Sequence, residues 1–142
     1  MGKVISTNIS LKKGTPKVPV EKITLIEGLG VEGDAHSGTE REVSLLSLND
    51  VKSFGRNPGD FAENITFDGI KTEEIEIGTM LKVGETLLKV TAIGKRCHSK
   101  CAIYREMGDC IMPKRGIFAK VIEGGEVKPG DKIEILGRDQ LS

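Results

Sequence analysis

The stretch MLKVGETLLKVTAI, residues 80–93, predicts a β-hairpin and thereby indicates the class of the fold. It consists of two mostly apolar runs, residues 80–83 and 86–93, joined by the pair Gly84-Glu85. A two-residue connection that begins with glycine is typical of a tight hairpin turn. Alternate residues of the second run form one apolar side, as in a strand that lays one face on a core.

The same pattern recurs along the chain, where 18 glycines separate short apolar segments. Short strands with glycine turns at fairly regular spacing indicate a barrel or a sandwich. Two short helices are also predicted, one over residues 49–54 with Asn49-Asp50 as its N-terminal cap and one over residues 99–108. The further predicted strands are residues 3–10, 18–27, 41–48, 64–67, 117–122 and 132–136.

The composition is that of one ordinary soluble domain, with 142 residues of which 30% are charged and 37% are hydrophobic. The 21 basic and 21 acidic side chains cancel, whereas a generic nucleic-acid binder carries a basic excess. No apolar run has the length of a transmembrane helix, and the N-terminus lacks the apolar core of a signal peptide. We therefore expect a cytoplasmic protein without a membrane or nucleic-acid partner.

The main candidates for chemistry are the three cysteines Cys97, Cys101 and Cys110. An odd number of cysteines in one short stretch is a poor basis for disulfides and indicates thiols kept free for reaction or ligation. Nearby cations and a helix N-terminus favour the reactive thiolate. The alternative is that the cysteines are small buried apolar residues. The cations beside them are Lys95, Arg96 and Lys100, and Ser99 is placed to cap the expected helix.

The same stretch permits a metal-site interpretation, in which Cys97, His98, Cys101 and Cys110 are counted as four zinc ligands. The spacing argues against it, because structural zinc sites usually take a second ligand pair from a distant segment. A soft metal held by one thiolate, such as molybdenum in a cofactor, needs only one of these cysteines.

Two other groups of polar residues are candidate binding residues. Asp34, His36 and Arg41 belong to a loop that leads into a strand, and an arginine there is suited to bidentate binding of a phosphate. Glu63 and Asn64 stand at the entrance of another strand. The alternatives are a solvated loop for the first group and a capped turn for the second.

Together these pieces resemble the MOSC family, named for the C-terminal domain of molybdenum-cofactor sulfurase. The most specific pieces are the stretch GDFAENIT, residues 59–66, and Cys101 placed after a long strand. The resemblance extends over nearly the whole chain. Its other carriers are the loop at residues 28–36, the strand start at 41–45, residues 115–119 and Gly130-Asp131.

The resemblance implies a mainly β fold, a Greek-key-like β-barrel that is closed or partly open, similar to the pyruvate-kinase barrel. Two or three short helices would accompany the barrel. It also implies a single MOSC-type domain over residues 1–137, followed by a polar tail over residues 138–142.

For function, the resemblance implies that Cys101 either carries sulfur as a persulfide for metal–sulfur or molybdenum-cofactor assembly, or ligates molybdenum in molybdopterin. Cys97 and Cys110 are the candidates that would resolve a persulfide. Whether the site turns over as a sulfurtransferase or forms part of a molybdoenzyme system stays open. The candidate cofactor contacts are Asp34, His36, Arg41, Glu63, Asn64, Arg96 and Arg115.

The resemblance also implies partners. Sulfurases carry a pyridoxal-phosphate desulfurase domain on the same chain, and this sequence has none, so pyridoxal phosphate would be bound only by a separate donor such as a cysteine desulfurase. Proteins of molybdenum-cofactor biosynthesis and molybdoenzymes are the other expected partners. Two alternatives remain: a cofactor-binding module without turnover and a structural zinc domain.

Overall fold

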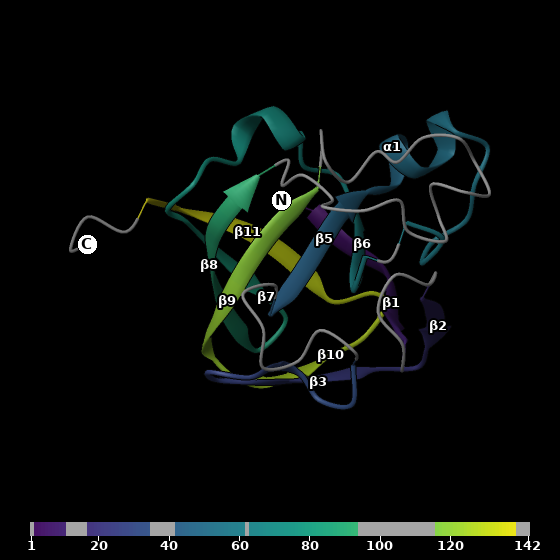
Figure 1. Cartoon of the computed structure of the whole chain (residues 1–142). Coiled ribbons are helices and arrows are strands. Elements are labelled where there is room, and N and C mark those ends of the chain that lie inside the picture. Colours follow the sequence, from purple (N-terminus) through teal and green to yellow (C-terminus); the bar gives the residue numbers. More distant parts are fainter. Residues whose placement is uncertain (1, 11–16, 35–41, 62, 94–115, 139–142) are drawn as a thin grey trace.

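A computed structural model describes residues 2–10, 17–34, 42–61, 63–93 and 116–138 of the chain. The described part is mainly β, as predicted, with one short α-helix and one 3-10 turn (Figure 1). The strands are β1 Gly2–Ile9, β2 Val18–Val20, β3 Ile23–Ile26, β4 Gly30–Val31, β5 Val43–Ser47, β6 Ile65–Asp68, β7 Thr79–Val83, β8 Thr86–Ile93, β9 Ile117–Glu123, β10 Gly125–Val127 and β11 Lys132–Arg138; the helices are α1 Leu48–Ser53 and η1 Thr72–Glu74.

The larger sheet closes on itself to form a barrel. Its strand order is β11-β7-β8-β9-β5-β6-β1, and β11 pairs again with β1, while β2 extends the sheet beyond β1. All of these pairings are antiparallel except β5 with β6, which is parallel because α1 and the turn after it carry the chain back before β6 begins. The structure thus confirms the predicted β-barrel.

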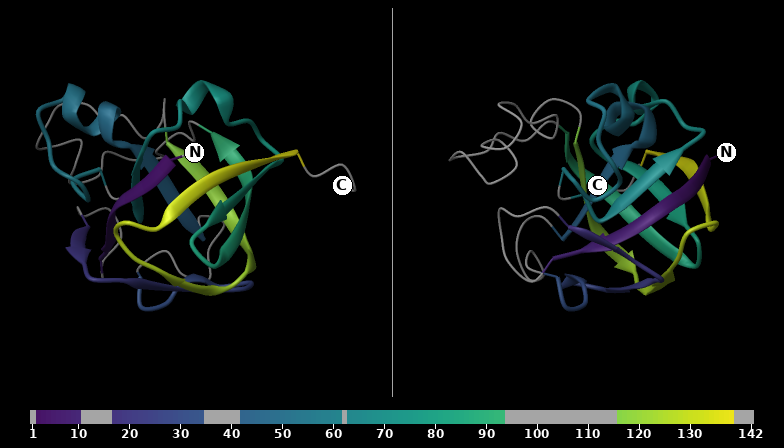
Figure 2. Two further views of the ribbon diagram at one scale, coloured as in Figure 1. Left: turned by 180° about the vertical axis from the view of Figure 1, so that it is seen from behind. Right: turned by 90° about the vertical axis from the view of Figure 1, so that its right-hand side faces the viewer.

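A second, three-stranded sheet in the order β10-β3-β4 lies across one end of the barrel, opposite the end at which α1 lies (Figures 1 and 2). Alternate residues of β3 are buried, so Ile23 and Leu25 turn toward the barrel interior. Val127 of β10 is fully buried in the same cluster. The small sheet therefore caps the apolar core at this end.

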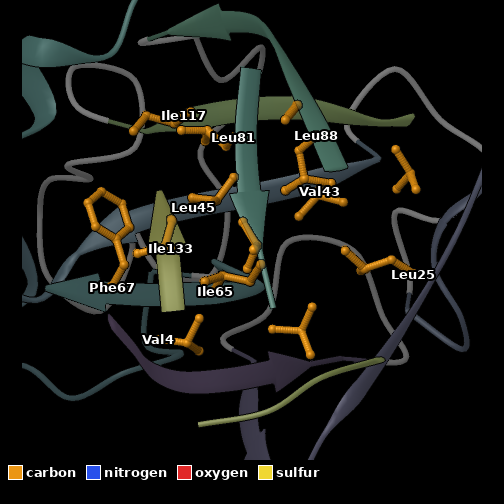
Figure 3. Packing of buried hydrophobic residues seen from close by; sticks show 14 of the residues in the cluster. Val4, Leu25, Val43, Leu45, Ile65, Phe67, Leu81, Leu88, Ile117 and Ile133 are labelled. Carbon is orange, nitrogen blue, oxygen red and sulfur yellow. The ribbon is translucent and has the colours of Figure 1, made fainter. Parts of the chain in front are cut away.

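The predicted hairpin is β7 and β8, which pair up to Val83 and Thr86 on either side of the turn. Gly84 has a φ of +57°, which suits glycine, and the Thr86 hydroxyl donates a hydrogen bond to the Val83 carbonyl at 2.7 Å. The apolar sides of both strands enter a core shared by all faces of the barrel (Figure 3). Its labelled members are Val4, Leu25, Val43, Leu45, Ile65, Phe67, Leu81, Leu88, Ile117 and Ile133.

Two predicted elements differ from the structure. The single strand expected over residues 18–27 is divided, because the chain bends at Glu21, so that β2 pairs with β1 and β3 joins the small sheet. The helix begins at Leu48 and is capped by Ser47 rather than by Asn49-Asp50, because the Ser47 hydroxyl oxygen accepts the Asp50 N–H at 3.2 Å. The second predicted helix, residues 99–108, lies outside the described residues.

Within the described ranges, no helix has the length and apolar character needed to cross a membrane.

Candidate functional site

The structure describes three of the predicted site residues, Asp34, Glu63 and Asn64. All three are buried, with 4%, 0% and 1% of their surface exposed. The remaining candidates lie outside the described residues, and their roles stay predictions: Cys97, Cys101, Cys110, His36, Arg41, Arg96 and Arg115.

The barrel fixes the two points between which residues 94–115, with all three cysteines, are inserted. β8 ends at Ile93 and β9 begins at Ile117, and these two residues are paired across the neighbouring strands. The same row continues through Leu45 of β5 to Ile65 of β6. Ile117 and Ile65 are thus two strand spacings apart, ~10 Å. Asn64, which directly precedes Ile65, therefore lies near the point where the chain re-enters the barrel after the cysteine segment.

Asp34 takes part in a buried ion pair with Lys17. The Lys17 ammonium donates to both oxygens of the Asp34 carboxylate, at 2.8 and 3.1 Å, and both side chains are fully shielded from solvent. The backbone N–H of Ser10 donates to the same carboxylate at 3.0 Å. Burial lowers the pKa of Lys17, and the hydrogen bond and charge of Asp34 oppose this effect.

This ion pair joins segments that are distant in sequence. Asp34 follows β4 and directly precedes residues 35–41, where the sequence predicts a binding loop with His36 and Arg41, whereas Lys17 directly precedes β2. The contact therefore anchors the start of the predicted binding loop to the end of β1 and the beginning of β2. The Asp34 carboxylate and the Lys17 ammonium bind each other inside the protein. In the described structure Asp34 therefore serves to hold the end of β4 against the segments around Ser10 and Lys17.

Glu63 lies in the interior with its carboxyl group turned toward neutral donors. Its Oε2 accepts hydrogen bonds from the Thr66 hydroxyl at 2.7 Å and from the Gly59 N–H at 3.1 Å. Its Oε1 is buried and has no hydrogen-bond partner among the described residues. Burial raises the pKa of Glu63, and the hydrogen bonds from the Thr66 side chain and from the backbone of Gly59, Glu63 and Phe61 oppose this rise.

Asn64 connects β5, β6 and β1 through its side-chain amide. Its Oδ1 accepts hydrogen bonds from the Ser44 N–H at 3.0 Å and the Ser44 hydroxyl at 3.1 Å, and its Nδ2 donates to the Asn8 carbonyl at 3.2 Å. Asn8 in turn donates from its Nδ2 to the Glu63 carbonyl at 3.1 Å and to the Thr66 hydroxyl oxygen at 3.3 Å. These contacts hold the entrance of β6 between its two neighbours.

Gly59 links the ion pair to this amide network. The Gly59 carbonyl accepts the backbone N–H of Lys17 at 2.7 Å, while the Gly59 N–H donates to the Glu63 carboxyl group. Its φ is +92°, and a Cβ atom at this position would lie 2.3 Å from the Lys17 carbonyl oxygen. Only glycine allows this approach, so the turn before β6 and the start of β2 are joined at a point where no side chain fits.

We refer to Asn8, Lys17, Asp34, Gly59, Glu63, Asn64 and Thr66 together as the buried polar cluster. Lys17 and Asn8 are members that the sequence did not predict. Asn8 carried a weak signal, because asparagine is depleted in strands and here stands near the end of one. Lys17 carried none, because lysine is almost never fully buried and its partner is far along the chain.

Among the described residues, no group of three or more histidine, cysteine, aspartate or glutamate side chains is arranged to hold a metal ion. The polar atoms of the buried polar cluster mostly bind one another. The donors that suit a molybdenum cofactor are the cysteine thiols for the metal and the arginines for a phosphate. The chain has both kinds of donor in residues 94–115 and at Arg41, so the chemistry of its donor set fits the group.

Comparison with known proteins supplies the relatives of this chain. The family model of the MOSC domain matches residues 32–134. YflK of Bacillus subtilis (strain 168), described as an uncharacterized protein, is 23% identical over 147 residues, which cover 92% of this chain and 66% of YflK. The chain thus spans just under two thirds of the length of that relative.

Solved structures show the same fold. YuaD from Bacillus subtilis superposes with a TM-score of 0.75 at 18% identity, covering 95% of this chain and 96% of YuaD. YiiM from Geobacillus stearothermophilus superposes with a TM-score of 0.72 at 20% identity, covering 96% of this chain and 75% of YiiM. At these identities the likeness concerns the fold.

Proposed function

Because this chain belongs to the MOSC domain family, we propose that it is a molybdenum-cofactor-related domain that works through the thiolate of Cys101. The observation that carries the proposal is the family match over residues 32–134, a range that includes all three cysteines and the polar loop before β5. The pairing of Ile93 with Ile117 supports it, because the cysteine segment is attached at neighbouring strands of a rigid barrel.

In the first form of the proposal, Cys101 carries sulfur. Its thiolate attacks the terminal sulfur of a persulfide on a donor protein, the sulfur–sulfur bond of the donor breaks, and the donor cysteine leaves as a thiolate. Cys97 or Cys110 then attacks the inner sulfur of the Cys101 persulfide, forms a disulfide with Cys101 and releases the outer sulfur as hydrosulfide for an acceptor. A dithiol reductant must reduce this disulfide before the next cycle. The donor is a separate protein such as a pyridoxal-phosphate-dependent cysteine desulfurase.

In the second form, Cys101 holds molybdenum within molybdopterin. The cofactor would supply the metal chemistry, and the residues of this chain would bind and orient it. A thiolate suits molybdenum, and Arg41, Arg96 and Arg115 would bind its phosphate. Asp34, Glu63 and Asn64 are engaged in buried contacts of their own and would take part by fixing the backbone at residues 34 and 63–64.

The decisive experiment is to incubate the whole chain with a cysteine desulfurase and free cysteine and to measure the intact mass without reductant. We expect a gain of one sulfur atom in the wild type and its loss in Cys101→Ser. Cys97→Ser and Cys110→Ser are the matched controls: both are expected to accept sulfur, and the variant that lacks the resolving thiol to retain it longer.

The alternatives give different results. Binding of molybdopterin that requires Cys101, without any mass gain from the desulfurase, would favour the cofactor-holding form. Cofactor binding that is retained in Cys101→Ser would favour a module without thiol chemistry. Stoichiometric zinc in the purified protein, with unfolding on chelation, would replace the proposal with a structural zinc domain.

A further inference from the structure

Among the described residues, the carboxyl group of Glu63 has neutral hydrogen-bond donors but no positively charged one. Glu63 is 0% exposed, and its Oε1 makes no hydrogen bond to the described part of the chain. Its Oε2 accepts from the Thr66 hydroxyl and the Gly59 backbone N–H, neither of which carries a positive charge. A buried carboxylate without a directly bound cation is costly, so the neutral acid is the form that this environment favours.

The charged groups around Glu63 lead to the same conclusion. Of the titratable side chains on the described segments around it, Lys17 and Asp34 are buried, whereas Asp50, Lys52, Arg56 and Asp60 are at least partly exposed. Lys17 and Asp34 already balance each other in their ion pair. Asp60 is half-buried and accepts the N–H of Asn57 within its own turn. The strands β1, β5 and β6 contribute the neutral side chains of Asn8, Ser44 and Thr66 to these hydrogen bonds, and their charged residues, Lys3 and Asp68, are exposed at the other end of the β1–β6 pair.

We propose that Glu63 is a proton-controlled latch: protonated, it leaves the Lys17–Asp34 ion pair intact, and when its proton passes to solvent base it draws Lys17 away from Asp34. A single residue connects Glu63 with Lys17. The Gly59 N–H donates to the Glu63 carboxyl group, and the Gly59 carbonyl accepts the backbone N–H of Lys17. An ionised Glu63 would favour the charged form of Lys17 and thus raise the pKa of that ammonium.

The ionised form would place two carboxylates in competition for one ammonium group. The ionised Oε1 of Glu63 would attract the Lys17 ammonium, whereas Asp34 retains the Ser10 N–H as a donor. Lys17 therefore shifts its hydrogen bonds toward Glu63, and the anchor at Asp34, directly before residues 35–41, is weakened. The inference stands apart from the proposed function, because it requires none of the cysteines.

Nuclear magnetic resonance of the full, isotopically labelled chain tests the inference. The Glu63 carboxyl carbon is followed with pH, together with the backbone amides of Lys17 and Gly59 and the Asp34 carboxyl carbon. We expect Glu63 to titrate above the ordinary value of 4.5, and the other three signals to change with the same midpoint. A Glu63 that titrates at its ordinary value, or whose titration leaves Lys17 and Asp34 unchanged, would overturn the proposal.

Glu63→Gln supplies the control, because an amide of the same shape cannot ionise. We expect it to abolish the pH-dependent change at Lys17, Gly59 and Asp34, while Glu32→Gln, on an exposed glutamate, leaves the change as in the wild type. The same transition in Glu63→Gln would contradict the latch. If that variant does not fold, the wild-type titration alone decides.

Discussion

At the scale of single residues, the ammonium of Lys17 and the carboxylate of Asp34 meet where water is excluded. Their side chains are fully shielded and their closest atoms are 2.8 Å apart. Removing two charges from water is expensive, so such a pair adds little net stability over apolar residues, but removing one partner leaves the other buried without its counter-charge. The pair thus serves chiefly to fix where its two segments meet.

Lys17→Met is accordingly expected to lower the free energy of unfolding by about 3–5 kcal/mol. The double variant Lys17→Met/Asp34→Leu is expected to recover part of this loss, because no lone charge remains. Urea denaturation measures both. The control is Lys22→Met, in the exposed pair of Lys22 with Glu126, which is 2.7 Å apart and is expected to change stability little. Equal losses in the Lys17 and Lys22 variants would contradict this account.

The burial of Glu63 predicts that the folded protein loses stability as the pH rises. Burial raises its pKa in the folded protein above 4.5, so the folded state holds the proton more tightly than the unfolded state. Its contribution is fully present below 4.5 and is lost as pH rises through the folded-state pKa. Relative to Glu63→Gln, the wild type is expected to lose stability above 4.5, by at most ~1.4 kcal/mol per pH unit. Denaturation of both proteins over a pH series gives the difference, and a flat difference would refute it.

At the scale of elements, the turn before β6 depends on Gly59. Its φ of +92° and the 2.3 Å that would separate an added Cβ from the Lys17 carbonyl oxygen leave no room for a side chain. Gly55 offers a matched comparison, because its φ is +68° and no atom lies within 4 Å of the same position. The two glycines therefore separate the cost of backbone conformation from the cost of contact.

Gly55→Ala is expected to cost ~1–2 kcal/mol, the usual penalty for an L-residue with positive φ. Gly59→Ala is expected to cost clearly more, because the turn must also move away from Lys17. Thermal or urea denaturation of the two variants gives the comparison. Equal losses would mean that the turn can give way without disturbing β2.

The elements also show what the sequence can and cannot reveal. The β7–β8 hairpin is predictable because its signal is local: two alternating runs and a glycine turn. The division of residues 18–27 into β2 and β3 has only a weak local signal, the polar pair Glu21-Lys22, because the bend at Glu21 reflects pairing with β1 on one side and β10 on the other. Asp34, Glu63 and Asn64 stand out in the sequence, but their burial depends on Lys17 and Asn8, which lie far away along the chain.

At the scale of the whole molecule, closure of the barrel by the β11–β1 pairing leaves one apolar interior, capped at one end by the small sheet. The described residues of the buried polar cluster lie on β1, β6 and the segments beside them, so the barrel and the cluster share their strands. The strand pattern predicted a barrel or sandwich, and the family resemblance narrowed it to a barrel. The pairing of β1 with β11, which closes the barrel, joins the two ends of the chain, and no local sequence pattern predicts it.

The pairing of Ile93 with Ile117 makes the cysteine-bearing part of the chain replaceable. A two-residue Asn-Gly connection suits adjacent antiparallel strands, so substituting it for residues 94–116 is expected to give a shortened barrel that folds cooperatively and lacks every cysteine. Circular dichroism and calorimetry would register its folding. Scaffold and reactive segment would then be separate modules, and grafting segments of other sequences between the same two isoleucines would test what chemistry this barrel can host.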